Sequence, residues 1–337
     1  MKSYSKIGVI GAGMIGSDHA LRIKDSLKGG VINGINDINK ENSKRLSKEL
    51  GGVKIFEDPH ALINSSEVDA ILVCSIGPTH EEFVLASIAA GKYVFCEKPL
   101  ATSAVACKKI VAAEMKFGKR LVQVGFMRRY DSGYQKLKKA IESFEIGDVL
   151  MMHCAHRNSS VPESYVTEMA VSDSLVHELD AVRWLLKEDY VSAQMILAKK
   201  TKYSHEKLHD PQMLLLETES GVRIDVEFFH NCQYGYDIQC EVVGSDGIMT
   251  LPEPESLVIR KGAKKFTNID PDWKNRFIDA YDIELQEFLD GISSENIKGP
   301  SSWDGYAAAM ASDVCIKAQK TGAIEPFSIV DIPDFYI

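Results

Sequence analysis

The sequence predicts an α/β protein of two domains, in which a doubly wound parallel sheet is followed by an α+β domain with an open, mostly antiparallel sheet. A length of 337 residues fits roughly two domains. Short apolar segments alternate with helical patterns up to about residue 125. Beyond that point the strands alternate apolar and polar residues, which is typical of a sheet with one buried face. We therefore expect domains at 1–125 and 126–337.

Composition and charge argue against several functional classes. The formal net charge of -9 argues against a nucleic-acid partner, because phosphate binding needs clustered positive charge. No apolar run approaches the roughly 20 residues of a membrane helix, and nothing at the N-terminus resembles a signal peptide. The seven cysteines lack any Cys-x-x-Cys spacing, so we expect reduced thiols in a cytoplasmic protein.

A glycine-rich turn follows the first apolar strand, at residues 7–10, and precedes a helical pattern. In such a turn the first glycine permits the tight bend, the second lets a pyrophosphate approach the backbone, and the third lets helix pack on strand. The phosphates then meet the N–H groups at the positive end of the helix. The turn consists of Gly11, Ala12, Gly13, Met14, Ile15 and Gly16. Its strand–turn–helix context predicts a dinucleotide site.

The second strand, at 31–35, leads to Asp37, about 20 residues past the last glycine of the turn. A carboxylate at this place binds the adenosine ribose hydroxyls. A helix-capping aspartate is the alternative. The carboxylate would repel a 2′-phosphate, and no arginine follows before Arg45. We therefore expect NAD rather than NADP, and Lys40 is the one residue nearby that counts against this choice.

The remaining elements of the first domain continue the alternation and bring the expected strands to six. They are a helix at about 39–50, a strand at 54–56, a strand at 70–74, a helix ending near residue 90, a strand at 93–96, a helix at 103–117 and a strand at 121–125. The turn after residue 74 should border the cofactor and holds Ser75, Pro78 and His80. His80 could equally be an exposed first-turn residue, and no catalytic role is assigned to it.

The strand at 93–96 ends in Glu97, Lys98 and Pro99, and the proline stops the strand. A lysine held at a strand end in an α/β sheet sits where such folds bind their ligands. A solvated strand end is an equally good interpretation of these residues taken alone.

The second half of the chain predicts mainly antiparallel strands. They are expected at 148–157, 195–200, 213–218, 222–228 and 238–243, with helices ending near residue 144 and at about 272–289 and 303–321. Residues 222–228 alternate apolar and charged side chains strictly, so one face of the sheet is buried and the other is polar. The polar face is either solvated or packed on another subunit, and nearby Met195, Phe229, Tyr234 and Tyr236 favour an oligomer. The sequence leaves open whether the helix at 303–321 packs on the first domain.

Between these strands, a helix with an apolar stripe carries Asp173 and His177. Four residues apart, they fall on one face of an α-helix and could converge on a common point. A capping aspartate and a satisfied, partly buried histidine form the alternative. Metal binding is disfavoured, because no third or fourth ligand of suitable spacing accompanies the pair.

These groups could together drive hydride transfer to a bound dinucleotide. Oxidation of a secondary alcohol needs a base for the hydroxyl proton, and the imidazole of His177 titrates near neutral pH. Lys98 could stabilise developing alkoxide charge if the domains bring the two residues together. Asp173 would orient the hydroxyl or the histidine, Glu97 would support the nicotinamide side of the cofactor, and no metal is needed.

The glycine turn, Asp37, residues 96–99 and the helix with Asp173 and His177 resemble the glucose–fructose oxidoreductase/inositol dehydrogenase/MocA superfamily (Gfo/Idh/MocA). Longer segments look specifically like bacterial inositol 2-dehydrogenases. These segments are 93–102, 122–131, 154–158 and 234–241. The resemblance spans both halves of the chain.

The resemblance implies a Rossmann domain that binds NAD, a catalytic set of Lys98, Asp173 and His177, a cis bond before Pro99, and a homotetramer. It further implies that a cyclic polyol is held by hydrogen bonds. The residues matching that role are Arg128, His156, Asn158, Tyr236 and Tyr281. A ring that bears only hydroxyls offers no charge, so many positioned donors and acceptors must recognise it.

The resemblance implies that the substrate is an inositol, with myo-inositol as the first choice. Scyllo-inositol or another isomer and glucose-like pyranoses remain open. A dehydrogenase of another sugar or polyol is the alternative within the superfamily. A non-catalytic dinucleotide-sensing regulator is a further alternative, since fold alone never establishes function. The presence of both Lys98 and His177 argues against the regulator.

Overall fold

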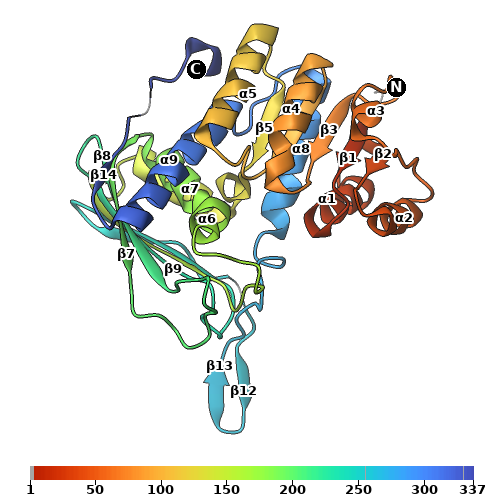
Figure 1. The fold of residues 1–337 in the computed structure, drawn as a ribbon. Coiled ribbons are helices and arrows are strands. Elements are labelled where there is room, and N and C mark those ends of the chain that lie inside the picture. The colour runs from red at the N-terminus through yellow and green to blue at the C-terminus, as the bar shows by residue number, and fades with distance from the viewer. Residues whose placement is uncertain (1–3, 255, 329) are drawn as a thin grey trace. The chain divides into compact units, whose positions relative to one another are not determined.

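The computed structural model describes residues 4–254, 256–328 and 330–337, which form two compact units (Figure 1). Within these residues, unit 1 comprises the chain up to Met127, Asp279–Met310 and Val330–Ile337, and unit 2 comprises the remainder. The sequence places one boundary near residue 125, and the chain first leaves unit 1 close to that position. The second half is discontinuous, however, because 279–310 returns to unit 1.

Unit 1 contains a five-stranded parallel sheet in the order β2-β1-β3-β4-β5. The strands are β1 Ser5–Ile10, β2 Gly30–Asn36, β3 Ala70–Val73, β4 Tyr93–Glu97 and β5 Val122–Gly125. Strand β3 is buried along its whole length, as its continuous apolar sequence predicts. The strand order turns back at β1 and β3, so their carboxyl ends form the switch point where such sheets bind ligands.

The helices of unit 1 follow the predicted alternation, with two differences. They are α1 Met14–Asp25, α2 Lys40–Glu49, α3 Pro59–Ile63, α4 His80–Ala89, α5 Ala104–Phe117, α8 Ile278–Ser294 and the first half of α9 Ser302–Thr321. The strand predicted at 54–56 is wrong, because only a single bridge joins Ile55 to Ile35. The short helix α3 was not expected, although Asp58 caps it by accepting from the N–H groups of His60 and Ala61.

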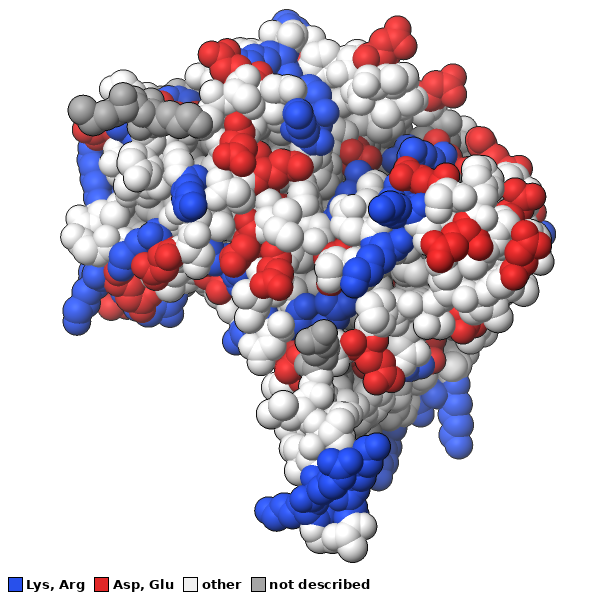
Figure 2. All heavy atoms as spheres, turned by 180° about the vertical axis from the view of Figure 1, so that it is seen from behind, with Lys and Arg blue, Asp and Glu red and all other residues white. Residues whose placement is uncertain are grey.

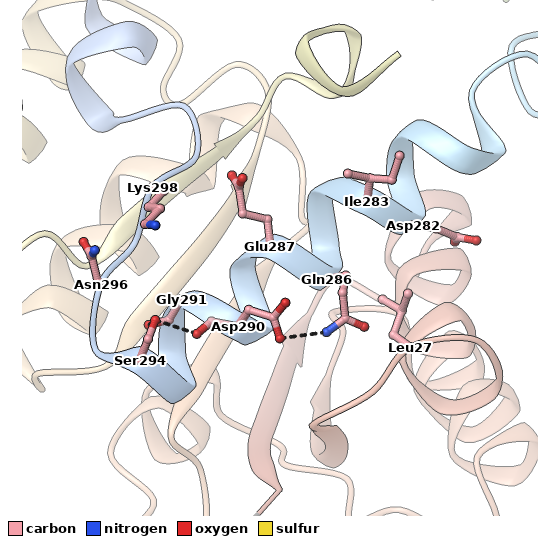
Figure 3. A pocket seen from close by; sticks show the side chains of 10 residues that line it. All are labelled: Leu27, Asp282, Ile283, Gln286, Glu287, Asp290, Gly291, Ser294, Asn296 and Lys298. Atoms are coloured by element: carbon pink, nitrogen blue, oxygen red, sulfur yellow. Dashed lines mark hydrogen bonds between the residues drawn. The ribbon is translucent and has the colours of Figure 1, made fainter. Parts of the chain in front are cut away.

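Helix α8 completes the core of unit 1 although it lies far along the chain. Leu285, Phe288 and Leu289 are fully buried in one cluster with the strand residues Ile7 and Phe95. This burial explains why residues 279–310 belong to the first unit. A surface pocket runs along the same helix and contains none of the predicted site residues (Figure 3). It is lined by Leu27, Asp282, Ile283, Gln286, Glu287, Asp290, Gly291, Ser294, Asn296 and Lys298.

Unit 2 contains a seven-stranded mixed sheet in the order β11-β10-β6-β9-β8-β7-β14. The strands are β6 Val149–Arg157, β7 Tyr190–Leu197, β8 Gln212–Thr218, β9 Arg223–Phe229, β10 Asp237–Gly244, β11 Ile248–Thr250 and β14 Glu325–Pro326. The pairings are antiparallel except for β6 with β9, as the predicted mostly antiparallel sheet requires. Buried and more exposed residues alternate along β9. Helices α6 Ser132–Glu142 and α7 Val176–Leu186 pack together in this unit.

Some elements of the second half of the chain differ from the prediction. Strand β7 runs from Tyr190 to Leu197 rather than from 195 to 200. Its register shifts between Tyr190 and Ser192, which breaks the alternation that marks the start of a strand. Helix α8 begins at Ile278, six residues later than predicted from 272. The hairpin of β12 Ile259–Lys261 and β13 Lys264–Phe266 was not predicted. Figure 2 shows its exposed Lys and Arg side chains as a basic tip.

Candidate active site

The glycine turn leaves one side of the backbone open to a ligand. A Cβ on Gly16 would lie 1.9 Å from the carbonyl oxygen of Gly11, and one on Gly11 would lie 2.5 Å from the backbone of Cys74. Both positions therefore exclude a side chain. A Cβ on Gly13 would meet nothing within 4 Å. The N–H groups at the start of α1 are thus accessible at Gly13, which fits a pyrophosphate at the helix N-terminus.

Asp37 joins the glycine turn to the start of α2. One carboxylate oxygen accepts from the N–H of Ala12 at 2.6 Å, and the other accepts from the N–H of Asn39 at 2.7 Å. The N-cap of α2 is Asn39, whose side chain accepts from the N–H of Glu41. The capping alternative considered for Asp37 therefore applies to Asn39 instead.

Arg45 also reaches the glycine turn, a contact that sequence spacing did not reveal. Its Nη2 donates to the carbonyl of Ala12 at 3.1 Å and to Oγ of Ser17 at 3.2 Å. Three exposed apolar side chains follow the carboxyl ends of the neighbouring strands β1, β2 and β3. Met14 is 62% exposed, Ile38 101% and Ile76 72%. Exposed apolar side chains at this edge suit the flat faces of a dinucleotide.

The turn after β3 is fixed by His80, which is buried. One ring nitrogen lies 2.7 Å from the carbonyl oxygen of Pro99, and the other lies 2.9 Å from that of Ser75. Burial lowers the pKa of His80, so the neutral ring donates from one nitrogen only. Ser75 is half-buried and Pro78 is exposed, so these two face the surface while His80 lies behind them.

Strand β4 ends at Glu97, and Lys98 follows it directly. The Lys98–Pro99 bond is cis, as the resemblance implies. Glu97 is buried, with one carboxylate oxygen 2.7 Å from Nε2 of His19. The other oxygen accepts from the N–H of Lys98 at 3.2 Å. Lys98 is half-buried. The solvated strand end considered from the sequence therefore does not describe Glu97.

Asp173 lies in a π-helix, Ala170–Leu175, that runs directly into α7. The regular helix predicted for this segment is therefore wrong at its start. The wider turn of a π-helix means that the one-face spacing of an α-helix does not apply between Asp173 and His177. Such turns occur frequently at functional sites. His177 is 8% exposed in the first turn of α7, and Asp173 is half-buried.

A buried charged cluster lies next to His177 in unit 2. Arg128, 1% exposed, forms an ion pair with Glu178, whose second oxygen lies 3.0 Å from Nδ1 of His156. Burial by itself raises the pKa of Glu178, but the charges of Arg128 and His156 bring it down to about 2. Burial lowers the pKa of His156. Nδ1 of His156 also lies 3.2 Å from Nη2 of Arg128, which can only donate, so this nitrogen has both a donor and an acceptor beside it.

His156 connects this cluster to other predicted residues. Its ring centroid lies 6.5 Å from that of His177 and 6.0 Å from that of Tyr236. Burial raises the pKa of Tyr236 to about 12, so its hydroxyl keeps its proton at neutral pH. Asn158 follows β6, where its N–H donates to the carbonyl of Phe229 at 2.9 Å. Unit 2 thus holds Arg128, His156, Asn158, Asp173, His177 and Tyr236.

Lys98 and Tyr281 belong to unit 1. The Tyr281 ring on α8 lies 5.4 Å from that of His19 and is 6% exposed.

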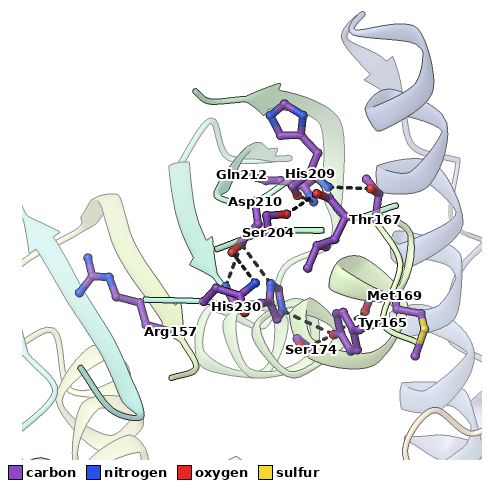
Figure 4. Close-up of polar contacts among 12 residues, drawn as sticks. Arg157, Tyr165, Thr167, Met169, Ser174, Ser204, His209, Asp210, Gln212 and His230 are labelled. Carbon is purple, nitrogen blue, oxygen red and sulfur yellow. Dashed lines mark hydrogen bonds and ion pairs between the residues drawn. The ribbon is translucent and has the colours of Figure 1, made fainter. Parts of the chain in front are cut away.

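A second buried polar network in unit 2 includes Ser174 of the π-helix (Figure 4). The hydroxyl of Tyr165 lies 2.6 Å from that of Ser174, the residue after Asp173, and 3.5 Å from Nε2 of His230. Asp210 in turn accepts from the N–H of His230 at 2.8 Å. Sequence reasoning missed these residues, and only the proximity of Ser174 to Asp173 offers a signal for them.

Two features of the described parts of the chain bear on other classes of site. Within residues 4–254, 256–328 and 330–337, no three His, Cys, Asp or Glu side chains converge as a metal site would require. No described helix combines the length and apolar character needed to cross a bilayer.

The fold and the site define an NAD-binding oxidoreductase, and comparison with protein families agrees. Residues 5–126 match the oxidoreductase family with an NAD-binding Rossmann fold, and residues 138–328 match the C-terminal alpha/beta domain of that family. The chain belongs to the Gfo/Idh/MocA family of oxidoreductases. The predictions of an NAD-dependent enzyme acting on a CH–OH group and of a Rossmann domain with a mostly antiparallel second sheet are confirmed.

Particular relatives cover almost the whole chain. The inositol 2-dehydrogenase of Burkholderia lata is 55% identical over 332 residues, 98% of each chain. That of Pseudomonas syringae pv. syringae is 55% identical over 98% of this chain and 99% of its own. A crystal structure of myo-inositol dehydrogenase from Lactobacillus casei with NAD(H) and myo-inositol has a TM-score of 0.96 and 36% identity, covering 99% of this chain and 100% of that one.

Proposed function

We propose that the protein is an inositol 2-dehydrogenase, which oxidises a ring secondary hydroxyl of myo-inositol or scyllo-inositol to the ketone with NAD. The observation that supports this most strongly is the 55% identity to inositol 2-dehydrogenases over 98% of the chain. The 36% identity to the Lactobacillus casei myo-inositol dehydrogenase, at a TM-score of 0.96, supports the same substrate class.

The catalytic set is Lys98, Asp173 and His177. When bound, NAD supplies the hydride acceptor. His177 takes the hydroxyl proton of the substrate, since imidazole titrates near neutral pH. The ammonium of Lys98 stabilises the negative charge that develops on the oxygen. Asp173, half-buried in the π-helix, orients the hydroxyl or the imidazole.

The substrate is a neutral ring, and the buried cluster of unit 2 supplies matched hydrogen-bonding groups for it. Nδ1 of His156 is held between Glu178 and Arg128, which leaves its Nε2 for a hydrogen bond with a substrate hydroxyl. The protonated hydroxyl of Tyr236 donates. Arg128 pairs with Glu178, and its charge keeps that carboxylate ionised. Lys98, Asn158, Asp173, His177 and Tyr281 complete the proposed substrate set.

The cofactor set is built mainly from backbone groups. The turn of Gly11, Gly13, Met14, Ile15 and Gly16 receives the pyrophosphate, and Asp37 the adenosine ribose. Ser75, Pro78, Glu97 and Lys98 border the nicotinamide half. His80 is buried and supports the turn from behind rather than contacting the cofactor directly.

The protein forms a homotetramer in this proposal and works in the cytoplasm. Apolar side chains are exposed on strands of the unit 2 sheet: Met151 is 41% exposed, Ile196 41% and Met213 36%. Ile196 and Met213 pair across neighbouring strands, so they form part of one patch. The cysteine thiols form no disulfide within the described residues, which suits a reducing compartment. A light-scattering mass of a stable monomer at micromolar concentration would contradict the tetramer.

A panel of polyols tests the substrate. The purified protein is incubated with NAD and myo-inositol, scyllo-inositol, other inositol isomers, glucose and xylose, and NADH formation is followed by its absorbance. The highest kcat/KM is expected for an inositol. Rapid turnover of a pyranose with none of any inositol would support the related sugar dehydrogenase instead. NAD binding without turnover of any alcohol would support the dinucleotide-sensing regulator.

A further inference from the structure

One fully buried histidine of unit 1 has no part in the roles described above. His19 lies on α1, and its side chain is 0% exposed. Its Nε2 lies 2.7 Å from a carboxylate oxygen of Glu97. The ring packs edge-on against Phe95, with centroids 5.6 Å apart, and beside Tyr281 at 5.4 Å. A polar ring held among aromatic side chains in a core points to a specific requirement for its hydrogen bond.

The surroundings of His19 determine where its proton lies. Nδ1 is buried and makes no hydrogen bond to the described part of the chain. Nε2, in contrast, faces a carboxylate oxygen of Glu97 at 2.7 Å, and a carboxylate oxygen only accepts hydrogen bonds. Nε2 therefore carries a proton and donates it to Glu97. His19 is thus a fixed donor aimed at one carboxylate oxygen.

The second carboxylate oxygen of Glu97 faces the residue that carries the proposed chemistry. It accepts from the N–H of Lys98 at 3.2 Å. Gly125 packs closely against the same carboxylate, since a Cβ at that position would lie 3.2 Å from it. Each oxygen of Glu97 therefore has a defined partner, one of which is the backbone of Lys98.

We propose that His19 is a positioning residue, which fixes Glu97 and through it the backbone turn that presents Lys98. The inference rests on the catalytic role proposed for Lys98. Helix α1 begins at the glycine turn that receives the pyrophosphate, so His19 places the cofactor-binding helix and the Lys98 turn in one fixed geometry. Loss of the Nε2–H donor leaves a buried carboxylate oxygen without its partner, and Glu97 then rotates and shifts Lys98.

Two substitutions at position 19 separate the hydrogen bond from the packing. His19→Phe keeps a ring against Phe95 and Tyr281 but removes the donor, and His19→Gln keeps an N–H donor. We expect His19→Phe to lower kcat roughly tenfold or more, because a displacement of about 1 Å can cost about 10²-fold. The dissociation constant for NAD, measured by fluorescence titration, should stay within about threefold, since the glycine turn binds through its backbone.

His19→Gln should recover most of the lost kcat, a result that a purely structural role would not produce. A wild-type kcat in His19→Phe, or equal losses in both variants, would overturn the proposal. If His19→Phe does not fold, His19→Met takes its place with the same expectation, since methionine fills irregular core space. In a double-mutant cycle, His19→Phe should add little to the loss caused by Glu97→Ala. Additive losses would contradict action through Glu97.

Lys98→Ala distinguishes failure of this inference from failure of the proposed function. Near-normal turnover in Lys98→Ala would remove the proposed mechanism and the inference together. Strong loss in Lys98→Ala with wild-type kcat in His19→Phe would remove the inference alone.

Discussion

The carboxylate of Glu178 lies 3.0 Å from Nδ1 of His156, and the same carboxylate forms a buried ion pair with Arg128. Removing one member of such a pair leaves an uncompensated buried charge, at a cost of about 3–5 kcal/mol. Glu178→Gln should therefore lower the free energy of unfolding on this scale, measured in urea at pH 7. It should also lower kcat/KM for the polyol, because the ring of His156 loses the carboxylate that holds its Nδ1. Glu253→Gln, an exposed site of the same unit, is the control and should change neither quantity.

The stability that Glu178 contributes should depend on pH. Its pKa is about 2 in the folded chain and ordinarily 4.5, so the contribution is present above about pH 4.5 and is lost as pH falls toward 2. A shift of this size corresponds to a contribution on the order of 3 kcal/mol. The difference in unfolding free energy between the wild type and Glu178→Gln should shrink between pH 6 and pH 3. A difference that stays constant over this range would show that the pKa is not lowered.

The proposed catalytic residues make a direct prediction. Lys98→Ala and His177→Ala should each lower kcat by about 10²-fold or more, the usual scale for acid–base and electrostatic groups, while NAD still binds. Steady-state kinetics measure the first quantity and fluorescence titration with NADH the second. Lys108→Ala, at an exposed lysine of α5, is the matched control. Near-normal turnover in either variant at position 98 or 177 would exclude that residue from catalysis.

Gly13 and Gly16, two of the three glycines of the turn, should respond differently to substitution by alanine. Gly16→Ala places a Cβ 1.9 Å from the carbonyl oxygen of Gly11, so we expect destabilisation of about 1–3 kcal/mol or more. Gly13→Ala meets no neighbouring atom within 4 Å and should keep the wild-type Tm. Its Cβ occupies the side open to the pyrophosphate, so NAD affinity should fall about tenfold or more. Equal NAD affinity in Gly13→Ala and the wild type would place the pyrophosphate elsewhere.

The cofactor preference should respond to Asp37. Asp37→Ser removes the carboxylate that repels a 2′-phosphate, and Arg45 already reaches the glycine turn. The ratio of kcat/KM for NADP to that for NAD should rise at least about tenfold, which corresponds to about 1.4 kcal/mol. Adding Arg45→Ala should reverse the gain. An unchanged ratio in Asp37→Ser would mean that Asp37 does not face the ribose.

The parts of the fold that the sequence predicted well are those encoded by neighbouring residues. Continuous apolar runs reveal strands buried on both faces, such as β3, and alternation reveals β9. Strand β7 was misplaced because its register shift interrupts the alternation. The π-helix before α7 was missed, because the apolar stripe that predicted the helix begins at Leu175, the last residue of the π-helix.

The residues of the candidate site also fall into two groups, those in contiguous motifs and those brought together only by folding. The glycine turn and the Glu97–Lys98 pair are contiguous motifs, and the sequence locates them. Their partners depend on which side chains meet in the folded chain. His19 and Glu97 are 78 residues apart, and Arg128 and Glu178 are 50 apart. No periodicity connects such pairs, so only the tertiary structure reveals them.

The π-helix at Ala170–Leu175 determines how this segment can change by insertion or deletion. A chain one residue shorter there could form a continuous α-helix with regular hydrogen bonds. Each residue of an α-helix advances about 100° around its axis, so everything before the deletion would rotate by that angle relative to α7. The buried side chains of Ala170 and Val171 would turn away from their present contacts while His177 stayed in place. Local regularity and the burial of these residues therefore compete, so a shorter homologue of this segment should repack the residues before α7.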